Sequence, residues 1–260
     1  MPSKLMTLFR AKAGRPRAQF VERCEDRYVP LISQSLPFVQ CQRRHYVTDE
    51  RSPALVAAGS PFVETGLDMI AEWVIANNSK QTDMDRSLTD PDIQRAIRKI
   101  EAELFDTAHV ERFAVETVHA PPVPLAPRPA GLAGPPAIRT FVLLQKNPTM
   151  SRRQFVDHYE NGHVPLVLKH LARDGVPLFA TYVRNYPARS DMRGLAGPFA
   201  GDQASYDALS EMCYWSEADA EAFAPCMTTE AAIVAFAREN EIMLKPDGFR
   251  MVQVETYGGG

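Results

Sequence analysis

The sequence AQFVERCEDRYVPL occupies residues 18–31, and RQFVDHYENGHVPL occupies residues 153–166. The two stretches align without a gap, and they are identical at Gln19/Gln154, Phe20/Phe155, Val21/Val156, Glu25/Glu160, Val29/Val164, Pro30/Pro165 and Leu31/Leu166. Two further matches follow in the same order, residues 68–72 with 207–211 and residues 115–117 with 254–256. This ordered similarity indicates that the chain contains two diverged copies of one unit.

A proline-rich stretch separates the two copies. Residues 120–137 contain seven prolines in eighteen positions. Proline fixes φ and removes a backbone donor, so the stretch predicts a semi-rigid connector and no sheet or helix. The expected organisation is therefore a first domain at 1–119, a linker at 120–137 and a second domain at 138–260.

Hydrophobic patterning predicts the same elements in both copies. In the first copy, strands are expected at 4–10, 37–47, 65–75 and 111–118, with helices at 16–35 and from residue 89. In the second copy, strands are expected at 138–145, 179–186, 205–215 and 249–257, with helices from Ser151, from Pro165 and over 229–244. Asn161-Gly162 predicts a left-handed stop between the first two of these helices.

The element order β-α-β-β-α-β is that of the ferredoxin-like unit. Such a unit packs helices on one face of an antiparallel sheet and leaves the other face uncovered. Two linked units would each leave an apolar face in water if they stayed apart, which is unfavourable. We therefore expect an α+β fold in which two fused ferredoxin-like units close into one intramolecular barrel.

Composition narrows the function classes. The chain has 260 residues, a formal charge of -3 and 23% charged residues, so there is no basic excess for nucleic acid. It has no apolar run of roughly 20 residues and no signal-peptide pattern, which predicts a cytoplasmic protein without a membrane partner. The four cysteines, Cys24, Cys41, Cys213 and Cys226, are widely spaced, which favours free and mostly buried thiols.

The segment FVDHYENGHVPL, Phe155 to Leu166, resembles the EthD family of the dimeric α+β barrel superfamily. Single-domain members of that superfamily form their barrel by homodimerisation, so this chain resembles a covalent version of the dimer. The resemblance implies small-molecule chemistry: EthD-like proteins include decarboxylases, dehydratases and accessory proteins, and related barrels isomerise lactones or oxidise phenols without metals. The first copy departs from the motif, with Tyr28 at the position of His163 and Cys24 at that of Tyr159.

His163 is the leading candidate for a catalytic group, because imidazole exchanges a proton near neutral pH. The alternative is that His163 only caps a helix end. Tyr159 lies four residues before His163, so we expect both side chains on the same side of the gap between helices and sheet. Tyr159 would either orient a substrate oxygen or fill the core. Asn161 is a helix-end residue and a secondary candidate for substrate binding.

Strand residues supply the remaining candidates. Tyr182, Arg184 and Tyr186 alternate and so share a face, on which Arg184 could hold an anion or could simply be a solvated strand-end residue. The sequence alignment places Arg43 opposite Arg184 and His45 opposite Tyr186. Two more substrate-binding candidates are Phe179, as apolar lining, and Asp207. Asp207 and Glu211 of the second copy correspond to Asp68 and Glu72 of the first. Because the acidic pair occurs in both copies, a structural role as an ion pair or cap is an open alternative to a role in catalysis.

Metal and cofactor motifs are missing from the sequence. His158, His163 and His170 do not share one helical face, and there is no phosphate loop, nucleophile elbow or dinucleotide fingerprint. We therefore predict no cofactor and no metal. The leading hypothesis is a cofactor-independent lyase, a decarboxylase or dehydratase, that acts on an aromatic or polyketide-like acid or phenol.

Two other functions stay open at this point. One is a non-catalytic ligand-binding or accessory protein, and the other is a cofactor-free monooxygenase or isomerase. The expected partner is a small-molecule substrate, and a homodimer of the fused pair is possible.

Overall fold

Eight antiparallel strands close into a barrel in the computed structural model, which describes residues 3–48, 65–75, 86–119, 124–188 and 204–258. The strands are β1 (Ser3–Phe9), β2 (Val39–Val47), β3 (Met69–Ile75), β4 (Glu111–Val118), β5 (Ile138–Lys146), β8 (Thr181–Pro187), β9 (Ala208–Tyr214) and β10 (Leu244–Tyr257). Their order around the barrel is β1-β3-β2-β10-β5-β9-β8-β4. The expected α+β class with a closed barrel is confirmed.

Each half of the chain supplies four strands in the same relative order. The neighbours run β4-β1-β3-β2 in the first half and β10-β5-β9-β8 in the second. Two seams join the halves edge to edge, one where β10 pairs with β2 and one where β4 pairs with β8. The barrel therefore has no free sheet edge, although each half alone would have two.

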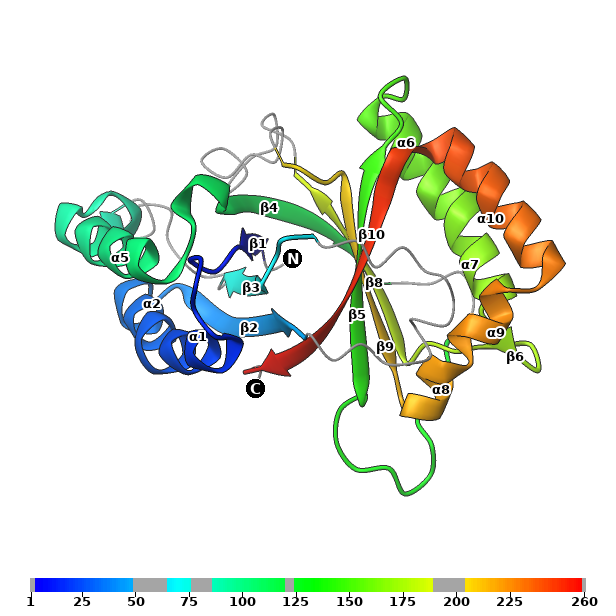
Figure 1. Cartoon of the computed structure of the whole chain (residues 1–260), viewed down its shortest axis with the longest axis horizontal. Helices are drawn as coiled ribbons and strands as arrows, with labels where there is room; N and C mark the ends of the chain where they lie inside the picture. The colour runs from blue at the N-terminus through cyan, green and yellow to red at the C-terminus, as the bar shows by residue number, and fades with distance from the viewer. Residues whose placement is uncertain (1–2, 49–64, 76–85, 120–123, 189–203, 259–260) are drawn as a thin grey trace.

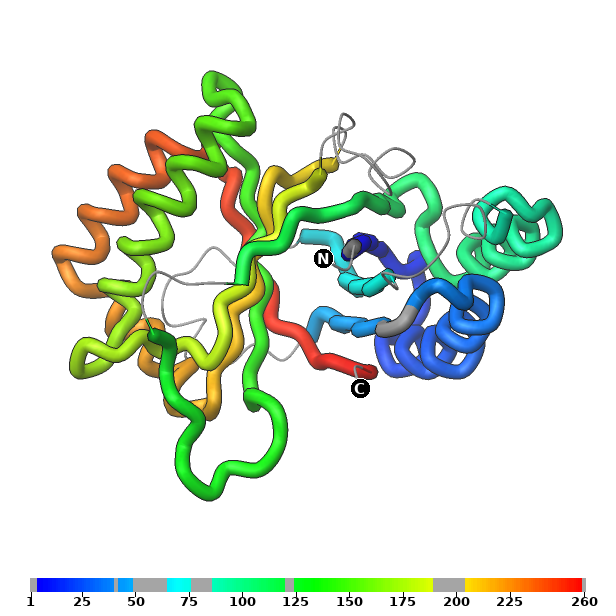
Figure 2. Tube along the Cα trace, turned by 180° about the vertical axis from the view of Figure 1, so that it is seen from behind, coloured from blue at the N-terminus to red at the C-terminus, as the bar shows by residue number. Residues whose placement is uncertain are grey.

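Helices lie outside the barrel, in two groups on opposite sides of it (Figure 1), and the view from behind shows the same arrangement (Figure 2). The first group contains α1 (Arg17–Arg23), η1 (Cys24–Tyr28), α2 (Val29–Ser35) and α5 (Pro91–Leu104), with the short 3-10 turn η2 (Thr107–His109). The second group contains α6 (Arg152–His158), η3 (Tyr159–His163), α7 (Val164–His170), α8 (Glu217–Glu221), α9 (Phe223–Met227) and α10 (Glu230–Met243). A two-stranded ribbon, β6 (Ala172–Arg173) and β7 (Val176–Pro177), follows α7.

Helix starts follow the capping rules that the sequence displays. Ser151 accepts from the Gln154 backbone and forms a complete capping box at the start of α6. Asp90 caps α5, with Pro91 in its first turn, and Thr229 caps α10. These local contacts fix where the helices that cover the two sheet faces begin.

The expected helix stop at Asn161-Gly162 is wrong. The chain continues from α6 into α7 through η3, a π-helical turn, and Gly162 does not have a positive φ. The first half repeats this arrangement, with η1 between α1 and α2. A π-turn adds one residue to the helix and accommodates the missing N–H of the following proline, so glycine is not needed as a terminator here.

Apolar side chains form three clusters that match this layering. One cluster lies between helices and sheet in the first half and includes Phe20, Tyr28 and Trp73. A second lies between helices and sheet in the other half, and we call it the second-half core. The third fills the barrel interior, with residues such as Phe113 and Phe141 from facing strands. The two helix–sheet layers are therefore separate from the barrel interior. A buried site must lie either in one of these layers or inside the barrel.

A bulge in β10 adjusts the strand where it meets the second-half core. The pairing with β5 shifts between Leu244 and Phe249, and Asp247 there has a φ of 56°. Gly248 fits because a Cβ at this position would lie 2.6 Å from the Gln145 carbonyl oxygen. The bulge turns the Phe249 side chain toward the second-half core.

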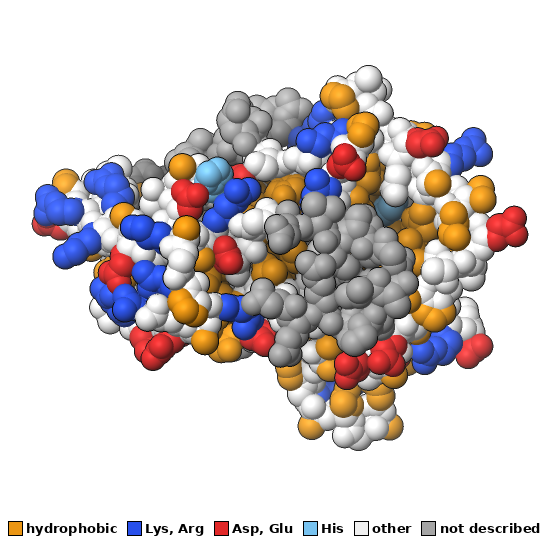
Figure 3. Space-filling model, in the orientation of Figure 1, with side chains coloured by type: hydrophobic (Ala, Val, Ile, Leu, Met, Phe, Trp, Pro, Cys, Tyr) orange, Lys and Arg blue, Asp and Glu red, His pale blue; other side chains and the backbone are white. Residues whose placement is uncertain are grey.

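Three of the four cysteines are free thiols in the described chain, with Cys24 and Cys213 buried and Cys226 half-buried. This agrees with the expectation from their spacing, while the side chain of Cys41 lies outside the described residues. None of the described helices combines the length and apolar character that crossing a bilayer requires. On the face drawn in Figure 3, basic side chains are interspersed with acidic ones over the helices of the first half.

Candidate functional site

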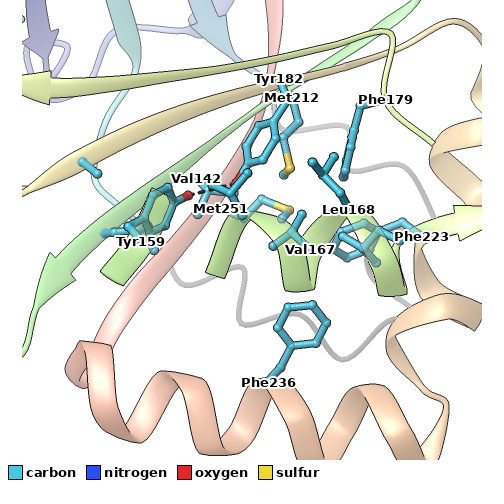
Figure 4. Close-up of a cluster of buried hydrophobic side chains, with 14 of the residues drawn as sticks. Val142, Tyr159, Val167, Leu168, Phe179, Tyr182, Met212, Phe223, Phe236 and Met251 are labelled. Carbon is cyan, nitrogen blue, oxygen red and sulfur yellow. Dashed lines mark hydrogen bonds between the residues drawn. The ribbon is translucent and has the colours of Figure 1, made fainter. Parts of the chain in front are cut away.

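A cavity of about 140 Å³ lies between helices and sheet in the second half. Its walls are mainly apolar, and Figure 4 shows this lining, with Val167 from α7 and Phe236 from α10 facing side chains of the sheet. The lining residues are Val142, Tyr159, His163, Val167, Leu171, Tyr182, Ser210, Met212, Phe223, Met227, Phe236, Asn240, Phe249 and Met251. Three of the residues that the sequence singled out, Tyr159, His163 and Tyr182, belong to this lining.

The π-turn η3 brings His163 and Tyr159 to the cavity together. Tyr159 begins the turn and His163 ends it, and both are buried. Their rings stack with centroids 4.9 Å apart and an interplanar angle of 20°. The His163 ring also contacts Phe236 edge-on, at 6.1 Å. The extra residue in the turn therefore directs two side chains four positions apart into the same space.

The imidazole of His163 is neutral and incompletely bonded. Burial, and after it the charge of His158, lowers the pKa of His163 to about 3. Its Nδ1 atom has no hydrogen-bond partner in the described part of the chain. A buried ring nitrogen without a partner costs free energy, so a ligand that bonds to it would recover that cost.

A chain of hydroxyl groups forms the other polar part of the cavity. The Tyr159 hydroxyl lies 3.1 Å from the Tyr182 hydroxyl and 2.8 Å from the Ser210 hydroxyl, and Figure 4 shows the two tyrosines pointing toward each other. Burial raises the pKa of Tyr159 and also that of Tyr182, so both phenols keep their protons at neutral pH. The cavity thus offers neutral hydroxyl groups together with a neutral imidazole.

Arg184 is fully buried, but it does not line the cavity. Its guanidinium donates to both oxygens of Glu160, at 3.1 and 2.6 Å, and to the Tyr182 carbonyl at 3.0 Å. Tyr186 donates its hydroxyl to the same carboxylate. The expectation of a solvated strand-end arginine is therefore wrong, because Glu160 on η3 compensates the charge inside the protein. Its role as an anion anchor stays a prediction.

The first half contains the same arrangement around Glu25. Arg44 donates to both Glu25 oxygens and Tyr46 donates to one of them. The equivalents of Arg184 and Tyr186 are thus Arg44 and Tyr46, one residue later than the expected Arg43 and His45. The shared pattern in the sequence is Arg-x-Tyr on each strand, and this pattern could have corrected the alignment.

The other predicted binding residues lie around the cavity at different depths. Tyr182 lines the cavity, and Phe179 packs behind it with ring centroids 5.5 Å apart. Asn161 is exposed and donates to the Asp157 carbonyl, as a helix-surface residue does. Asp207 accepts from the Lys146 backbone N–H at 2.8 Å, outside the cavity lining.

The repeated acidic pattern has structural partners in both halves. Asp68 accepts from the Ala11 backbone at 2.7 Å, as Asp207 does from Lys146. Glu72 pairs with Lys4 at 2.8 Å and Glu211 pairs with Arg139 at 2.7 Å. The geometry favours the cap and ion-pair interpretation that the sequence left open.

Sequence reasoning missed Ser210, Asn240 and Phe236. Ser210 lies on the face of β9 opposite Glu211, and the alternation of Ser210 with Met212 was the available signal. Phe236 and Asn240 lie one helical turn apart on α10, where the period of four could have indicated a shared face. Across the described ranges, no cluster of three or more His, Cys, Asp or Glu side chains could hold a metal ion.

An acid-linked loss of stability follows from the buried His163. Unfolded histidine binds a proton near pH 6.5, whereas folded His163 does so only near pH 3, so acid favours the unfolded chain. From about pH 5.5 to pH 4.5, His163 should reduce the free energy of unfolding by about 1.4 kcal/mol. Urea unfolding of the parent and of His163→Asn measures this, because the variant lacks that contribution. Equal slopes against pH in the two proteins would contradict the burial of a neutral imidazole.

Residues 147–246 match the family model of the EthD domain. No curated protein matches the sequence. Among solved structures, the chain is similar to a proposed monooxygenase from Lactobacillus acidophilus NCFM, at 9% identity over 98% of this chain and 93% of that one, with a TM-score of 0.44. It is also similar to a mutant chlorite dismutase from Candidatus Nitrospira defluvii, at 9% identity over 98% and 91% of the chains, with a TM-score of 0.45.

Proposed function

We propose that the EthD domain of this chain, at residues 147–246, forms a binding site for a small aromatic molecule and acts on it as a cofactor-independent lyase. The observation that carries the proposal is the pairing of a neutral, unbonded imidazole with a hydroxyl chain inside one apolar cavity. Apolar pockets with a few convergent polar groups are the usual form of small-molecule sites.

Cavity size restricts the substrate. A volume of about 140 Å³ is close to the ~150 Å³ that holds one benzene ring in a protein interior. The buried part of the substrate is therefore a single ring that carries an oxygen substituent. A hydroxy acid of this kind places its ring among Val142, Met212 and Phe236 and directs an oxygen to the Tyr159 hydroxyl.

His163 serves as the base in this proposal. In a decarboxylation, the imidazole takes the proton of the substrate hydroxyl and returns it to the ring carbon that bears the carboxylate. The bond from that carbon to the carboxylate then breaks, carbon dioxide leaves, and the phenolate product takes a proton from water. In a dehydration, the imidazole removes a proton from carbon and returns it to the departing hydroxyl, which leaves as water. Both reactions need only proton transfer and exclusion of water.

Tyr159 and Arg184 have different roles in the proposed mechanism. Tyr159 touches the cavity and donates to the substrate oxygen, while Ser210 and Tyr182 fix its hydroxyl. Arg184 acts through Glu160, which lies between Tyr159 and His163 on the same turn. We therefore assign Arg184 a positioning role in place of direct contact with the substrate.

A non-catalytic binding protein is the second candidate, and the low pKa of His163 favours it. Proton transfer is most efficient when the pKa of the catalytic group lies near the working pH, whereas that of His163 is about 3. A carrier needs only the cavity and its hydrogen bonds. A cofactor-free monooxygenase on phenols would use the same cavity and would require molecular oxygen.

Incubation with hydroxybenzoic and hydroxycinnamic acids, with and without oxygen, tests these functions. For a lyase, we expect release of carbon dioxide or loss of water by mass spectrometry at equal rates in both atmospheres. Conversion only in the presence of oxygen would replace the lyase by an oxygenase. Saturable binding, detected by calorimetry, with no change in the acid would leave the accessory protein as the function.

The domain plan belongs to the same proposal. We interpret 1–119 and 138–260 as two fused ferredoxin-like units that arose by duplication, joined by the linker at 120–137. The equal strand order, the two π-turns and the two Glu-Arg-Tyr clusters support this interpretation. Cytoplasmic location and a homodimer of the fused pair stay predictions from the sequence.

A further inference from the structure

The first half contains a cavity of its own, at the position that corresponds to the site in the second half. It lies between the helices α2 and α5 and the sheet, and its volume is about 380 Å³. The lining residues Leu5, Ile32, Phe38 and Ile97 are apolar, as in the second-half cavity. This volume falls within the range of ligand pockets, so it suits a molecule larger than one ring.

A buried acid forms the first polar group of this cavity. Glu101 on α5 is 6% exposed, and its Oε1 atom accepts from the Tyr28 hydroxyl at 3.1 Å and from the Arg112 guanidinium. Both bonds reach the same oxygen, and Oε2 receives none from the described residues. The pair of Glu101 and Arg112 has no net charge, so it does not select for a charged ligand.

Trp73 supplies the second polar group. Its side chain lines the cavity from β3, it is 6% exposed, and its Nε1 has no hydrogen-bond partner among the described residues. A buried indole N–H usually finds an acceptor, and leaving it unbonded costs free energy. Among the polar side chains of the lining, Trp73 therefore contributes an unused donor and Glu101 an unused acceptor.

We propose that the first-half cavity binds an uncharged fused-ring aromatic molecule with a hydroxyl group, which donates to Glu101 and accepts from Trp73. The rings lie among the apolar side chains of α2, α5 and the sheet. Tyr28 occupies the position of His163, so the described lining of this cavity contains no imidazole, and we expect the site to bind its ligand without converting it. This site uses no residue of the proposed catalytic cavity and goes beyond the proposed function.

Indole N–H resonances test the proposal directly, because the chain has two tryptophans. In protein labelled with ¹⁵N at tryptophan, Trp215→Phe identifies the Trp73 resonance. On titration with 2-naphthol, we expect the Trp73 N–H to move downfield and to saturate, as a new hydrogen bond requires. Trp215 should stay in place, because its Nε1 already donates to the Ala126 carbonyl at 2.9 Å. A Trp73 resonance that does not move up to the solubility limit of 2-naphthol would overturn the proposal.

Matched variants separate this site from the second-half cavity. By calorimetry, Trp73→Phe should weaken 2-naphthol binding about tenfold, since it keeps the ring and loses one hydrogen bond, while Trp215→Phe should leave it unchanged. Naphthalene, which has no hydroxyl, should bind about tenfold more weakly than 2-naphthol. His163→Asn should not affect the binding of 2-naphthol at Trp73. A negative result for the first-half cavity is therefore distinct from a negative result for the lyase proposal. Equal affinity of parent and Trp73→Phe would also refute the assignment.

Discussion

Replacing His163 by asparagine is expected to lower kcat about 100-fold on the hydroxy acid that the protein converts, because loss of a positioned general base has roughly that effect. Asparagine keeps a polar group near the position of Nδ1 but cannot take up a proton. The KM should change by no more than about threefold, since the apolar lining and the Tyr159 hydroxyl remain. Steady-state kinetics of both proteins measures the two parameters separately.

The pH profile provides an independent test of the same role. A base with a pKa of about 3 is unprotonated, and so active, throughout the neutral range. Between about pH 5 and pH 8 the kcat/KM of the parent should therefore show no ionisation that His163→Asn removes, and the acid limb should appear below about pH 4. A limb near pH 6.5 that disappears in the variant would mean that His163 is exposed to solvent and is not the buried group described here.

His158→Asn is the matched control for this substitution. His158 lies on the preceding turn, outside the cavity lining, with its Nε2 2.8 Å from Glu239. His158 is only the second cause of the low pKa of His163, after burial, so the imidazole stays unprotonated at neutral pH in this variant. The kcat of His158→Asn should therefore stay within about twofold of the parent. A loss in His158→Asn as large as that in His163→Asn would indicate that the helix, and not the imidazole, controls the rate.

The sequence was sufficient to predict the α+β class and the closed barrel. Strand patterning and the capping residues are local signals, and both appear in the folded chain. The match between residues 18–31 and 153–166 aligns His163 with Tyr28 and Tyr159 with Cys24. In the structure these pairs lie on the corresponding turns η3 and η1. That Tyr159 and His163 share one side followed from their spacing of four residues.

The details that sequence could not supply depend on tertiary contacts. Asn161-Gly162 has the composition of a helix stop, yet packing of the helix against the sheet keeps the chain helical through a π-turn. The sequence left a solvated Arg184 open, because its partner, Glu160, is 24 residues away in the chain. Ser210 has no signal of its own in the sequence, because its partner, the Tyr159 hydroxyl, is 51 residues away in the chain. A charged pattern is thus a poor guide to the site when the charges have partners inside the fold.

The half-buried carboxylate of Glu160, which holds the buried Arg184, gives rise to the largest expected change in stability. Glu160→Ala removes the partner of Arg184, whose side chain is 0% exposed, and leaves that charge uncompensated. Breaking a buried pair in this way costs about 3–5 kcal/mol. Tyr186 also loses its acceptor, and its ring packs on Tyr159 at 6.0 Å, so the hydroxyl chain of the cavity should loosen as well. Urea unfolding at neutral pH gives the change in free energy.

Glu25→Ala in the first half is the matched control, since Glu25 holds Arg44 and Tyr46 in the same way. The side chain of Arg44 is 10% exposed, so water partly compensates its charge and the loss in stability should be smaller than for Glu160→Ala. The double variant Glu160→Ala/Arg184→Met should recover most of the loss, because it removes both charges and keeps an apolar side chain of similar length. If Glu160→Ala alone unfolds at the same urea concentration as the parent, then Arg184 reaches water without its partner. The interpretation of this cluster as a buried support of the cavity would then be wrong.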